Sequence, residues 1–287
     1  AHYRFCALPA RGSAEREAAE RGSAEREAAE RGAAARIIPE TLRTLRLELE
    51  RYIRRFPEFY RSLAPLEAYP NLPHDPPVSA VRMHRASIAT LRVASGGSPV
   101  GPMAAVAGTF AELAAEAFLE ACGADNEDPS QPAETQPAEV IVENGGDISM
   151  FLQHPLLAAL FVGPDSPFSG LAFRISPEPG GGMRALCSSS GKMGHSYSTG
   201  TCDLATVCSR SAPLADAAAT SLCNSIRSAG DLPGELERIM KIEGVDGAVA
   251  VDGDELGQVG EVPRIVRHGD PELTAKISRD PDAGPWR

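Results

Sequence analysis

The spacing of apolar residues changes near residue 140, and this change limits the fold more than any other feature of the chain. Upstream, Leu42, Leu45 and Leu49 recur at helical spacing within 37–63. Downstream, short apolar runs separated by glycine and proline are typical of strands. We expect strands at 140–143, 148–151, 159–162, 171–175, 184–187 and 205–209, and helices at 102–121 and 213–226. Because the strands cluster between helices, the sequence predicts an α+β fold in layers, with mixed or antiparallel sheets packed against helices.

A perfect repeat near the N-terminus separates an arm from the rest of the chain. Residues 11–20 read RGSAEREAAE, and residues 21–30 repeat them. Alanine, glutamate and arginine favour helix, but a glycine interrupts each copy and no apolar stripe exists to be buried. We therefore expect 1–36 to form an N-terminal strand and a flexible, partly helical arm, and 37–287 to form one domain. Pro57 is expected to end the first long helix.

The acidic balance of the chain limits its partners. With 28 Lys and Arg against 39 Asp and Glu, the formal net charge is −11. Nucleic acid is therefore not expected as a partner, since that binding depends on neutralising phosphates with Lys and Arg. A phosphate ligand would have to be held by backbone N–H groups and a metal. No apolar run is long enough for a membrane span and no signal peptide is recognised, so we expect a cytoplasmic location and no membrane partner.

The six cysteines have no CxxC pair and no zinc-type spacing. We expect them to be small buried apolar side chains in a reducing compartment. Redox work by Cys187 and Cys202 is the weaker alternative.

The first segment with chemical potential is Glu-Asn-Gly-Gly-Asp at 143–147. It follows an apolar run, and its two glycines allow positive φ and the close approach of a ligand to the backbone. The Asn and Asp offer directed hydrogen bonds to a ribose or a heterocycle. A plain hairpin turn explains the same residues equally well, because Asn-Gly is a common hairpin signal.

A second segment, 187–203, is rich in serine, threonine and glycine and carries His195 and Asp203. Its N–H and O–H donors suit phosphate oxygens, and a histidine can act as a general base near neutral pH. The alternative is a polar surface hairpin with a solvated histidine. A Ser–His–Asp hydrolase has the residue types available, but no GxSxG elbow is present.

The third segment is a helix that starts near Ser211, which can cap it, with Pro213 in its first turn. Asp216 and Thr220 lie four residues apart, so their oxygens share one helical face, and only alanines separate them. A carboxylate and a hydroxyl, completed by carbonyls, waters and phosphates, suit Mg²⁺. Alternatively, Asp216 interacts with the helix dipole and Thr220 bonds its own backbone.

Together these segments resemble the ApbE-like superfamily, whose best-known members are FAD:protein FMN transferases. The shared pattern is a Gly-Gly-Asp turn, a Ser-Gly loop followed by His, and a helix with Ala-Asp-x-x-x-Thr. Here these are 145–147, 190–195 and 215–220. The chain is closer to an uncharacterised cytoplasmic branch of that superfamily, which shares sequences like RYIRRFPEFYRSL at 51–63 and SSGKMGHS at 189–196.

The resemblance implies a role for each segment. Asp216 and Thr220 would ligate Mg²⁺, with a backbone carbonyl near Val106 as the third protein ligand. His195 would stand where the transferases are thought to keep a catalytic base. A Thr or Ser hydroxyl of an acceptor protein would attack the metal-polarised pyrophosphate and release AMP. The residues lining the flavin nucleotide, FAD or FMN, would be Asn144, Gly145, Gly146, Asp147, Ser189, Ser190 and Gly191.

The chain departs from the transferase pattern at two places. The transferases have Lys-Gly before their central helix, where this chain has Ala107-Gly108, and an Asp-Pro after the histidine that is absent here. The leading hypothesis is a flavin-nucleotide-binding protein that acts as a Mg-dependent FMN transferase on FAD. The alternative is a non-catalytic module that binds or carries flavin or another phosphate ligand, which the departures favour. A structural partner protein acting through the arm is a third class.

Overall fold

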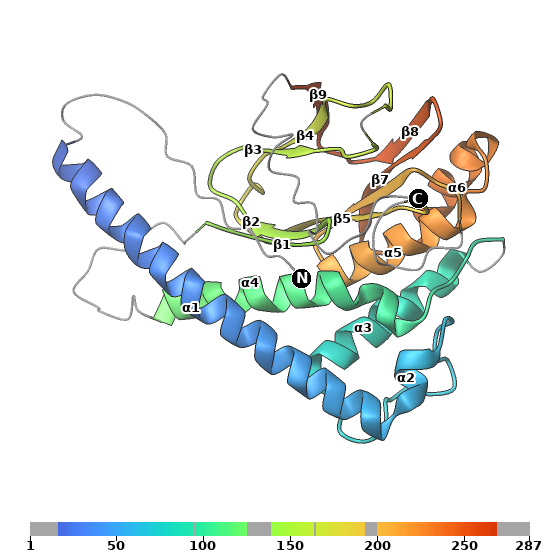
Figure 1. Cartoon of the computed structure of the whole chain (residues 1–287), viewed down its shortest axis with the longest axis horizontal. Coiled ribbons are helices and arrows are strands. Elements are labelled where there is room, and N and C mark those ends of the chain that lie inside the picture. The colour runs from blue at the N-terminus through green and yellow to red at the C-terminus, as the bar shows by residue number, and fades with distance from the viewer. Residues whose placement is uncertain (1–16, 94–95, 125–138, 164, 193–199, 269–287) are drawn as a thin grey trace.

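The computed structural model describes residues 17–93, 96–124, 139–163, 165–192 and 200–268. Two antiparallel sheets lie above a group of helices (Figure 1). The α-helices are α1 (Glu17–Arg55), α2 (Pro57–Arg61), α3 (Val78–Ala89), α4 (Val106–Ala124), α5 (Ala212–Ser225) and α6 (Leu232–Ile239), with short 3-10 turns at Thr90–Val93, Pro102–Ala105 and Ala229–Asp231. The predicted α+β class is confirmed.

The strands form one six-stranded and one three-stranded sheet. The larger sheet has the order β1-β2-β5-β6-β7-β8 and the smaller the order β3-β4-β9, and every neighbouring pair is antiparallel. The strands are β1 (Val140–Asn144), β2 (Asp147–Phe151), β3 (Leu156–Ala159), β4 (Leu171–Ile175), β5 (Arg184–Ser189), β6 (Leu204–Ser209), β7 (Val245–Asp252), β8 (Glu255–Gly260) and β9 (Arg264–Arg267).

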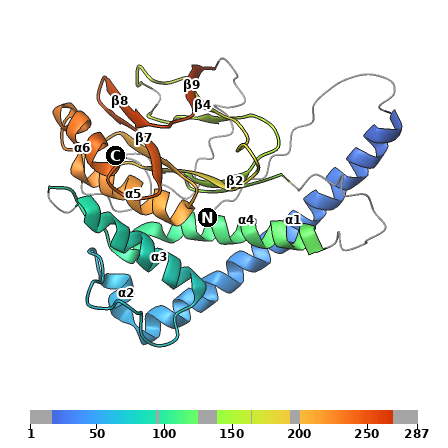
Figure 2. The same cartoon turned by 180° about the vertical axis from the view of Figure 1, so that it is seen from behind.

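Different elements cover the two faces of the six-stranded sheet. α4 and α5 lie along one face of this sheet. Figure 2 shows the same arrangement with the molecule turned around. On this face Ala185 and Cys187 of β5 belong to the same buried cluster as the alanines of α5. Leu186, between them, points to the opposite face and belongs to a cluster with Phe173 of β4. The alternation along β5 therefore divides a helical face from a face that meets the smaller sheet.

The first helix differs from its prediction at one end. The helix was expected within 37–63, after a flexible and partly helical arm, and α1 is continuous from Glu17 through Pro39 to Arg55. The second decamer is thus helical, as the helix propensities of alanine, glutamate and arginine allow. α1 ends at Arg55, just before Pro57, as predicted. Its buried stripe packs in one cluster with α4 and consists of Ala34, Ile38, Leu42, Leu45, Leu49 and Tyr52.

Some elements were misplaced or missed. The strand expected at 159–162 is β3, which ends at Ala159, because pairing with β4 selects the first half of a longer apolar run. α3, at Val78–Ala89, lies in a segment whose apolar spacing does not distinguish helix from strand. α6, β7, β8 and β9 were not predicted.

α4 and the turn before it form a strongly apolar stretch. Within the described residues, Pro102–Cys122 passes a test of length and composition for a membrane-crossing helix, but 61% of that window is buried inside the fold. Ala111, Ala114 and Ala115 are fully buried. The stretch is therefore explained as a core helix.

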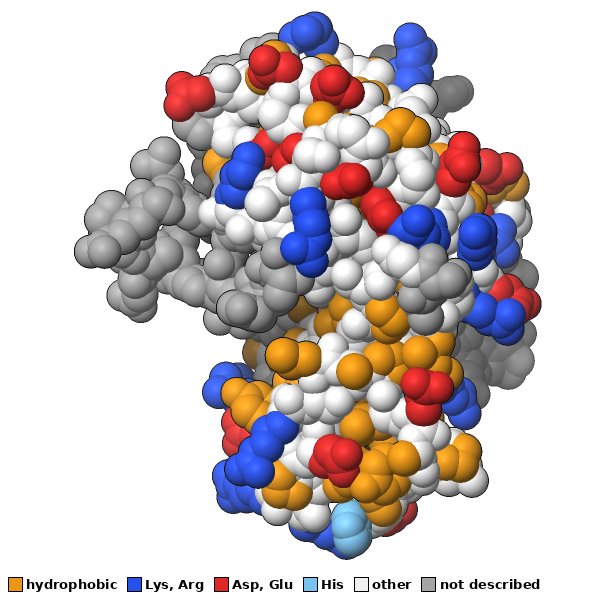
Figure 3. Space-filling model, turned by 90° about the vertical axis from the view of Figure 1, so that its right-hand side faces the viewer, with side chains coloured by type: hydrophobic (Ala, Val, Ile, Leu, Met, Phe, Trp, Pro, Cys, Tyr) orange, Lys and Arg blue, Asp and Glu red, His pale blue; other side chains and the backbone are white. Residues whose placement is uncertain are grey.

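Exposed apolar side chains gather at the helical end of the molecule. In Figure 3 apolar side chains are most frequent in the lower part of the visible face, where charged groups of both signs lie among them. Tyr60, Leu63 and Val78, from α2 and the approach to α3, are 60%, 77% and 50% exposed.

Candidate functional site

Three polar side chains lie in one row across neighbouring strands. Asn144 at the end of β1 pairs with Asp147 at the start of β2, and Asp147 pairs with Cys187 of β5. Paired residues point to the same face of a sheet. This is the helical face, because Cys187 packs with the buried alanines of α5. The register thus joins the first predicted segment to the start of the second.

The third segment meets this row at the first turn of α4. The Asn144 side-chain amide donates to the Ala107 carbonyl (3.3 Å). The Gly108 N–H donates to Asp216 Oδ2 (2.8 Å), and the Ala107 N–H contributes a second hydrogen bond to the same carboxyl. The first segment therefore bonds a carbonyl of this helical turn through Asn144, and the third segment bonds its N–H groups through Asp216.

α4 and α5 approach each other closely at this point. A Cβ on Gly108 would overlap the Ala212 carbonyl oxygen and lie 2.9 Å from the Cβ of Asp216. The Cys187 thiol donates to the same Ala212 carbonyl (3.5 Å). Glycine is thus required at 108 by helix packing.

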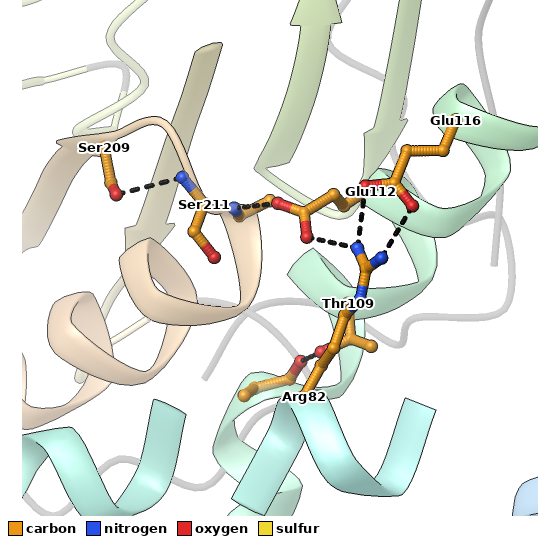
Figure 4. A network of polar contacts seen from close by, with 8 residues as sticks. Arg82, Thr109, Glu112, Glu116, Ser209 and Ser211 are labelled. Carbon is orange, nitrogen blue, oxygen red and sulfur yellow. Dashed lines mark hydrogen bonds and ion pairs between the residues drawn. The ribbon is translucent and has the colours of Figure 1, made fainter. Parts of the chain in front are cut away.

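A second carboxylate anchors the start of α5 (Figure 4). The Ala212 N–H donates to Glu112 Oε2 of α4 (2.6 Å), and Arg82 of α3 bridges Glu112 (2.6 Å) and Glu116 (2.8 Å). The predicted cap, Ser211, occupies the N-cap position but makes no side-chain capping bond. The prediction that Ser211 caps the helix is therefore wrong. The first N–H of α5 is instead accepted by Glu112 of the neighbouring helix α4.

Burial dominates the electrostatics of the site. It raises the pKa of Asp147 to about 7, against hydrogen bonds from the Cys187 thiol and the Ser188 N–H, and the charge of Glu143 adds to the rise. Burial also raises the pKa of Asp216, and the charge of Asp147 adds to it. One oxygen of Asp147, Oδ1, has no hydrogen-bond partner among the described residues. Two buried carboxyl groups therefore lie close enough to interact by charge, and no cationic side chain of the described residues is bonded to either.

The Gly-Gly turn is a tight hairpin, as one of the two interpretations predicted. Gly145 and Gly146 have φ of 68° and 108° and join β1 to β2. A Cβ on Gly145 would meet nothing within 4 Å, so its outer side is open. Asn144 and Asp147 flank this turn and point toward the helical face. The segment is therefore both a hairpin turn and a source of candidate site residues.

The Ser-Gly loop is only partly described. Ser189 ends β5 on the helical face, pairing with Ala205. Ser190 Oγ accepts the Lys192 N–H (3.1 Å). A Cβ on Gly191 would overlap the Gly200 carbonyl, so backbone packing by itself explains that glycine. His195, the predicted catalytic base, lies outside the described residues.

Thr220 is one turn beyond Asp216 in α5 and is 9% exposed. The two side chains share a helical face, as the spacing predicted. Among the described residues no group of three His, Cys, Asp or Glu side chains is arranged to hold a metal ion. A cation here would need the Thr hydroxyl, backbone carbonyls, waters or ligand phosphates to complete its shell.

Two side chains of this arrangement were not named as site residues from sequence. Cys187 was considered only as the start of the Ser-rich segment and as a weaker redox candidate, although it hydrogen-bonds Asp147. Glu112 is one of several glutamates in an alanine-rich helix, and nothing in its spacing distinguishes it. Of the described cysteines, 187, 202, 208 and 223 are buried and 122 is half-buried, which confirms the structural interpretation of these side chains.

The sequence of the chain matches a known protein family. A family model described as AbpE bacteria matches residues 24–233, most of the chain. The chain belongs to this family. The ApbE-like recognition based on the three segments is confirmed, and the matched range contains the Gly-Gly-Asp turn, the Ser-Gly loop and α5.

Three curated relatives of this AbpE-family chain carry the name UPF0280 protein. The relative from Methanothrix thermoacetophila is 39% identical over 224 residues, covering 77% of this chain and 81% of the relative. The relative from Methanocella arvoryzae is 37% identical over 238 residues, covering 83% and 85%. The relative from Methanopyrus kandleri is 36% identical over 230 residues, covering 77% and 80%.

Among solved structures, the chain is distantly similar to two flavin transferases. The apo flavinyl transferase ApbE of Pseudomonas stutzeri gives a TM-score of 0.34 at 14% identity, covering 56% of this chain and 48% of that one. A mutant of the flavin transferase ApbE of Vibrio cholerae gives 0.35 at 16% identity, covering 57% and 50%.

Proposed function

We propose that the chain binds a flavin nucleotide together with a divalent cation, at the carboxyl groups of Asp147 and Asp216. One observation carries the proposal. Both carboxyl groups are buried on the same face of the sheet, and Asp147 Oδ1 lacks a partner among the described residues. Buried carboxylates are normally paired or coordinate a metal. A cation between a nucleotide phosphate and these groups would supply the missing partner.

The residues present fit Mg²⁺ better than zinc. Mg²⁺ is usually held by one or two carboxylates, with waters and substrate phosphates completing its shell. Asp216 and Thr220 would hold the ion, and Asp147 would add a second negative charge nearby. When bound, the ion would neutralise phosphate charge and polarise the phosphorus–oxygen bonds.

The N–H groups of both helix starts are partly used already. Asp216 accepts the Gly108 N–H of α4, and Glu112 accepts the Ala212 N–H of α5. A phosphate would therefore depend on the cation and on the donors of the Ser-Gly loop around Ser189 and Ser190. Asn144 and the open side of Gly145 would contact the rest of the nucleotide.

Transfer of FMN is the further step that this binding would allow. An acceptor hydroxyl would form a bond to the FMN phosphorus, the pyrophosphate bond would break, and AMP would leave with the electron pair. The absence of the transferases' Lys-Gly and Asp-Pro favours binding without this step.

The test measures FAD binding with and without Mg²⁺, by the quenching of flavin fluorescence, followed by chromatography for AMP. We expect Mg²⁺-dependent binding that Asp216→Asn weakens at least about tenfold, as loss of a charged ligand implies. Asp254→Asn, in the exposed β7–β8 turn, is the matched control and should bind as the wild type does. Equal binding by Asp216→Asn would refute the cation site. Intact FAD in the complex identifies a binder, whereas AMP together with FMN bonded to a protein hydroxyl identifies a transferase.

A further inference from the structure

Two arginines stand directly opposite each other in the smaller sheet. Arg174 of β4 pairs with Arg264 of β9 in the antiparallel register. Side chains paired in this way share a face, with Cβ atoms about 5 Å apart, and like charges so placed are destabilising. Both residues are exposed. Their placement is therefore unfavourable unless something negative lies between them.

Among the residues that the structure describes, no carboxylate fills this role. The largely buried carboxylate of Glu178, between the two lining prolines 177 and 179, already pairs with Arg184 and with Arg210 (3.1 Å). Asp246 also lies near these two arginines, whose charges act on its pKa. No described carboxylate lies within ion-pair distance of Arg174 or Arg264. In a chain of net charge −11, this unpaired cationic pair stands out.

The pair opens onto a cavity of about 460 Å³. Arg174, Ser176, Arg184 and Arg264 line it, together with three prolines, 177, 179 and 263. Proline has no N–H, so the donors on this wall are the guanidinium groups and the Ser176 hydroxyl. The proline rings offer apolar surface beside them. The cavity is open to solvent, and its volume and its mixture of apolar wall and polar groups would allow a small molecule to bind at its surface.

This cavity is separate from the carboxylate site. Arg184 lies on the same face of β5 as Leu186, which packs toward the smaller sheet. Cys187 lies on the opposite face, with α5. The six-stranded sheet thus stands between the two, and the carboxylate site cannot supply the anion.

We propose that the Arg174–Arg264 pair is a binding site for a small organic phosphate, independent of the flavin proposal. A phosphate monoester is a dianion with three terminal oxygens, which suits two guanidinium groups and a hydroxyl. Its organic part would lie against the prolines. The bound dianion would also remove the repulsion between the opposed arginines.

The experiment uses phenyl phosphate as the probe and measures its binding to the whole chain by calorimetry at constant ionic strength. Arg174→Gln and Arg264→Gln should each weaken binding at least about tenfold, as loss of a charged bidentate donor implies. Arg267→Gln is the matched control, because Arg267 lies on β9 at a position of the opposite face. Asp216→Asn should bind the probe normally, even if it loses FAD.

Three results would overturn the proposal. They are no saturable binding by the wild type, an equal loss in Arg267→Gln, and unchanged binding in both Arg174→Gln and Arg264→Gln. Arg174→Lys keeps the charge but loses the bidentate fork. Arg174→Lys should weaken the binding of phenyl phosphate less than Arg174→Gln does. If Arg174→Gln does not fold, the affinity of Arg174→Lys is compared with that of the wild type instead. Inorganic phosphate as a second probe measures how much the phenyl ring adds.

Discussion

Glu112 of α4 and Asp216 of α5 cap each other's helices. The Ala212 N–H at the start of α5 donates to Glu112 Oε2 (2.6 Å), and the Gly108 N–H at the start of α4 donates to Asp216 Oδ2 (2.8 Å). In each helix the donor and the carboxylate lie four residues apart, on one face. The two helix starts are thus locked together over the sheet, and the carboxylate site is part of that lock.

The close approach of the two helices predicts a large effect of one methyl group. Gly108→Ala would place a Cβ into the Ala212 carbonyl, and backbone on both sides would have to move. We expect a loss of roughly 1–3 kcal/mol or more in the free energy of unfolding, measured by urea denaturation. Gly234→Ala, in α6 with nothing within 4 Å of the new Cβ, should instead gain up to about 1 kcal/mol. Equal stability of the two variants would contradict the packing argument.

The Arg82 bridge predicts that charge at Glu112 matters for stability. In Glu112→Gln the amide oxygen can still accept the Ala212 N–H, but Arg82 loses one of its two carboxylates, and an amide group stands beside the guanidinium. Because Glu112 is only 7% exposed, we expect a loss of about 1–3 kcal/mol in unfolding free energy.

The control for this variant is Glu50→Gln. Glu50 pairs with Arg46 (2.9 Å) on the surface of α1, and such exposed pairs contribute at most about 1 kcal/mol. If Glu112→Gln loses no more unfolding free energy than Glu50→Gln, the buried bridge between Arg82 and Glu112 does not stabilise the fold.

The raised pKa of Asp147 predicts a specific pH dependence of stability. Its folded pKa of about 7 exceeds the ordinary pKa of an aspartate, 3.8, so the folded state holds the proton more tightly. The stabilisation is therefore complete below pH ~4 and is lost as the pH rises toward ~7. Asp147→Asn removes this titration. Relative to wild type, the variant should gain stability over this window, by an amount on the order of a few kcal/mol. A difference that does not change between pH 4 and pH 7 would contradict the burial of this carboxyl.

The sequence predicted local features well and distant contacts poorly. The apolar stripe through Leu42, Leu45 and Leu49 predicted the buried face of α1, and the spacing of Asp216 and Thr220 predicted their shared face. The reciprocal caps join residues about a hundred positions apart, and no local pattern encodes such a pairing. The family resemblance joined the three segments where spacing alone did not. β7 was missed because it is a central strand of small and β-branched residues, interrupted by Gly247, without polar alternation.

Mg²⁺ offers a direct test of the carboxylate site without any flavin. A cation that binds deprotonated Asp147 and Asp216 competes with the protons that burial retains there, so its affinity should rise with pH. We expect Mg²⁺ to raise the melting temperature of the wild type at pH 8 and to have no effect at pH 4. Asp147→Asn should show a smaller shift, since the asparagine carries no charge, and Asp254→Asn, in the exposed turn, should respond as the wild type does. Calcium at the same ionic strength separates specific binding from screening, because the larger ion prefers more oxygen ligands than this site presents. Equal shifts with both ions and in all variants would mean that the two buried carboxyl groups hold protons and not a metal.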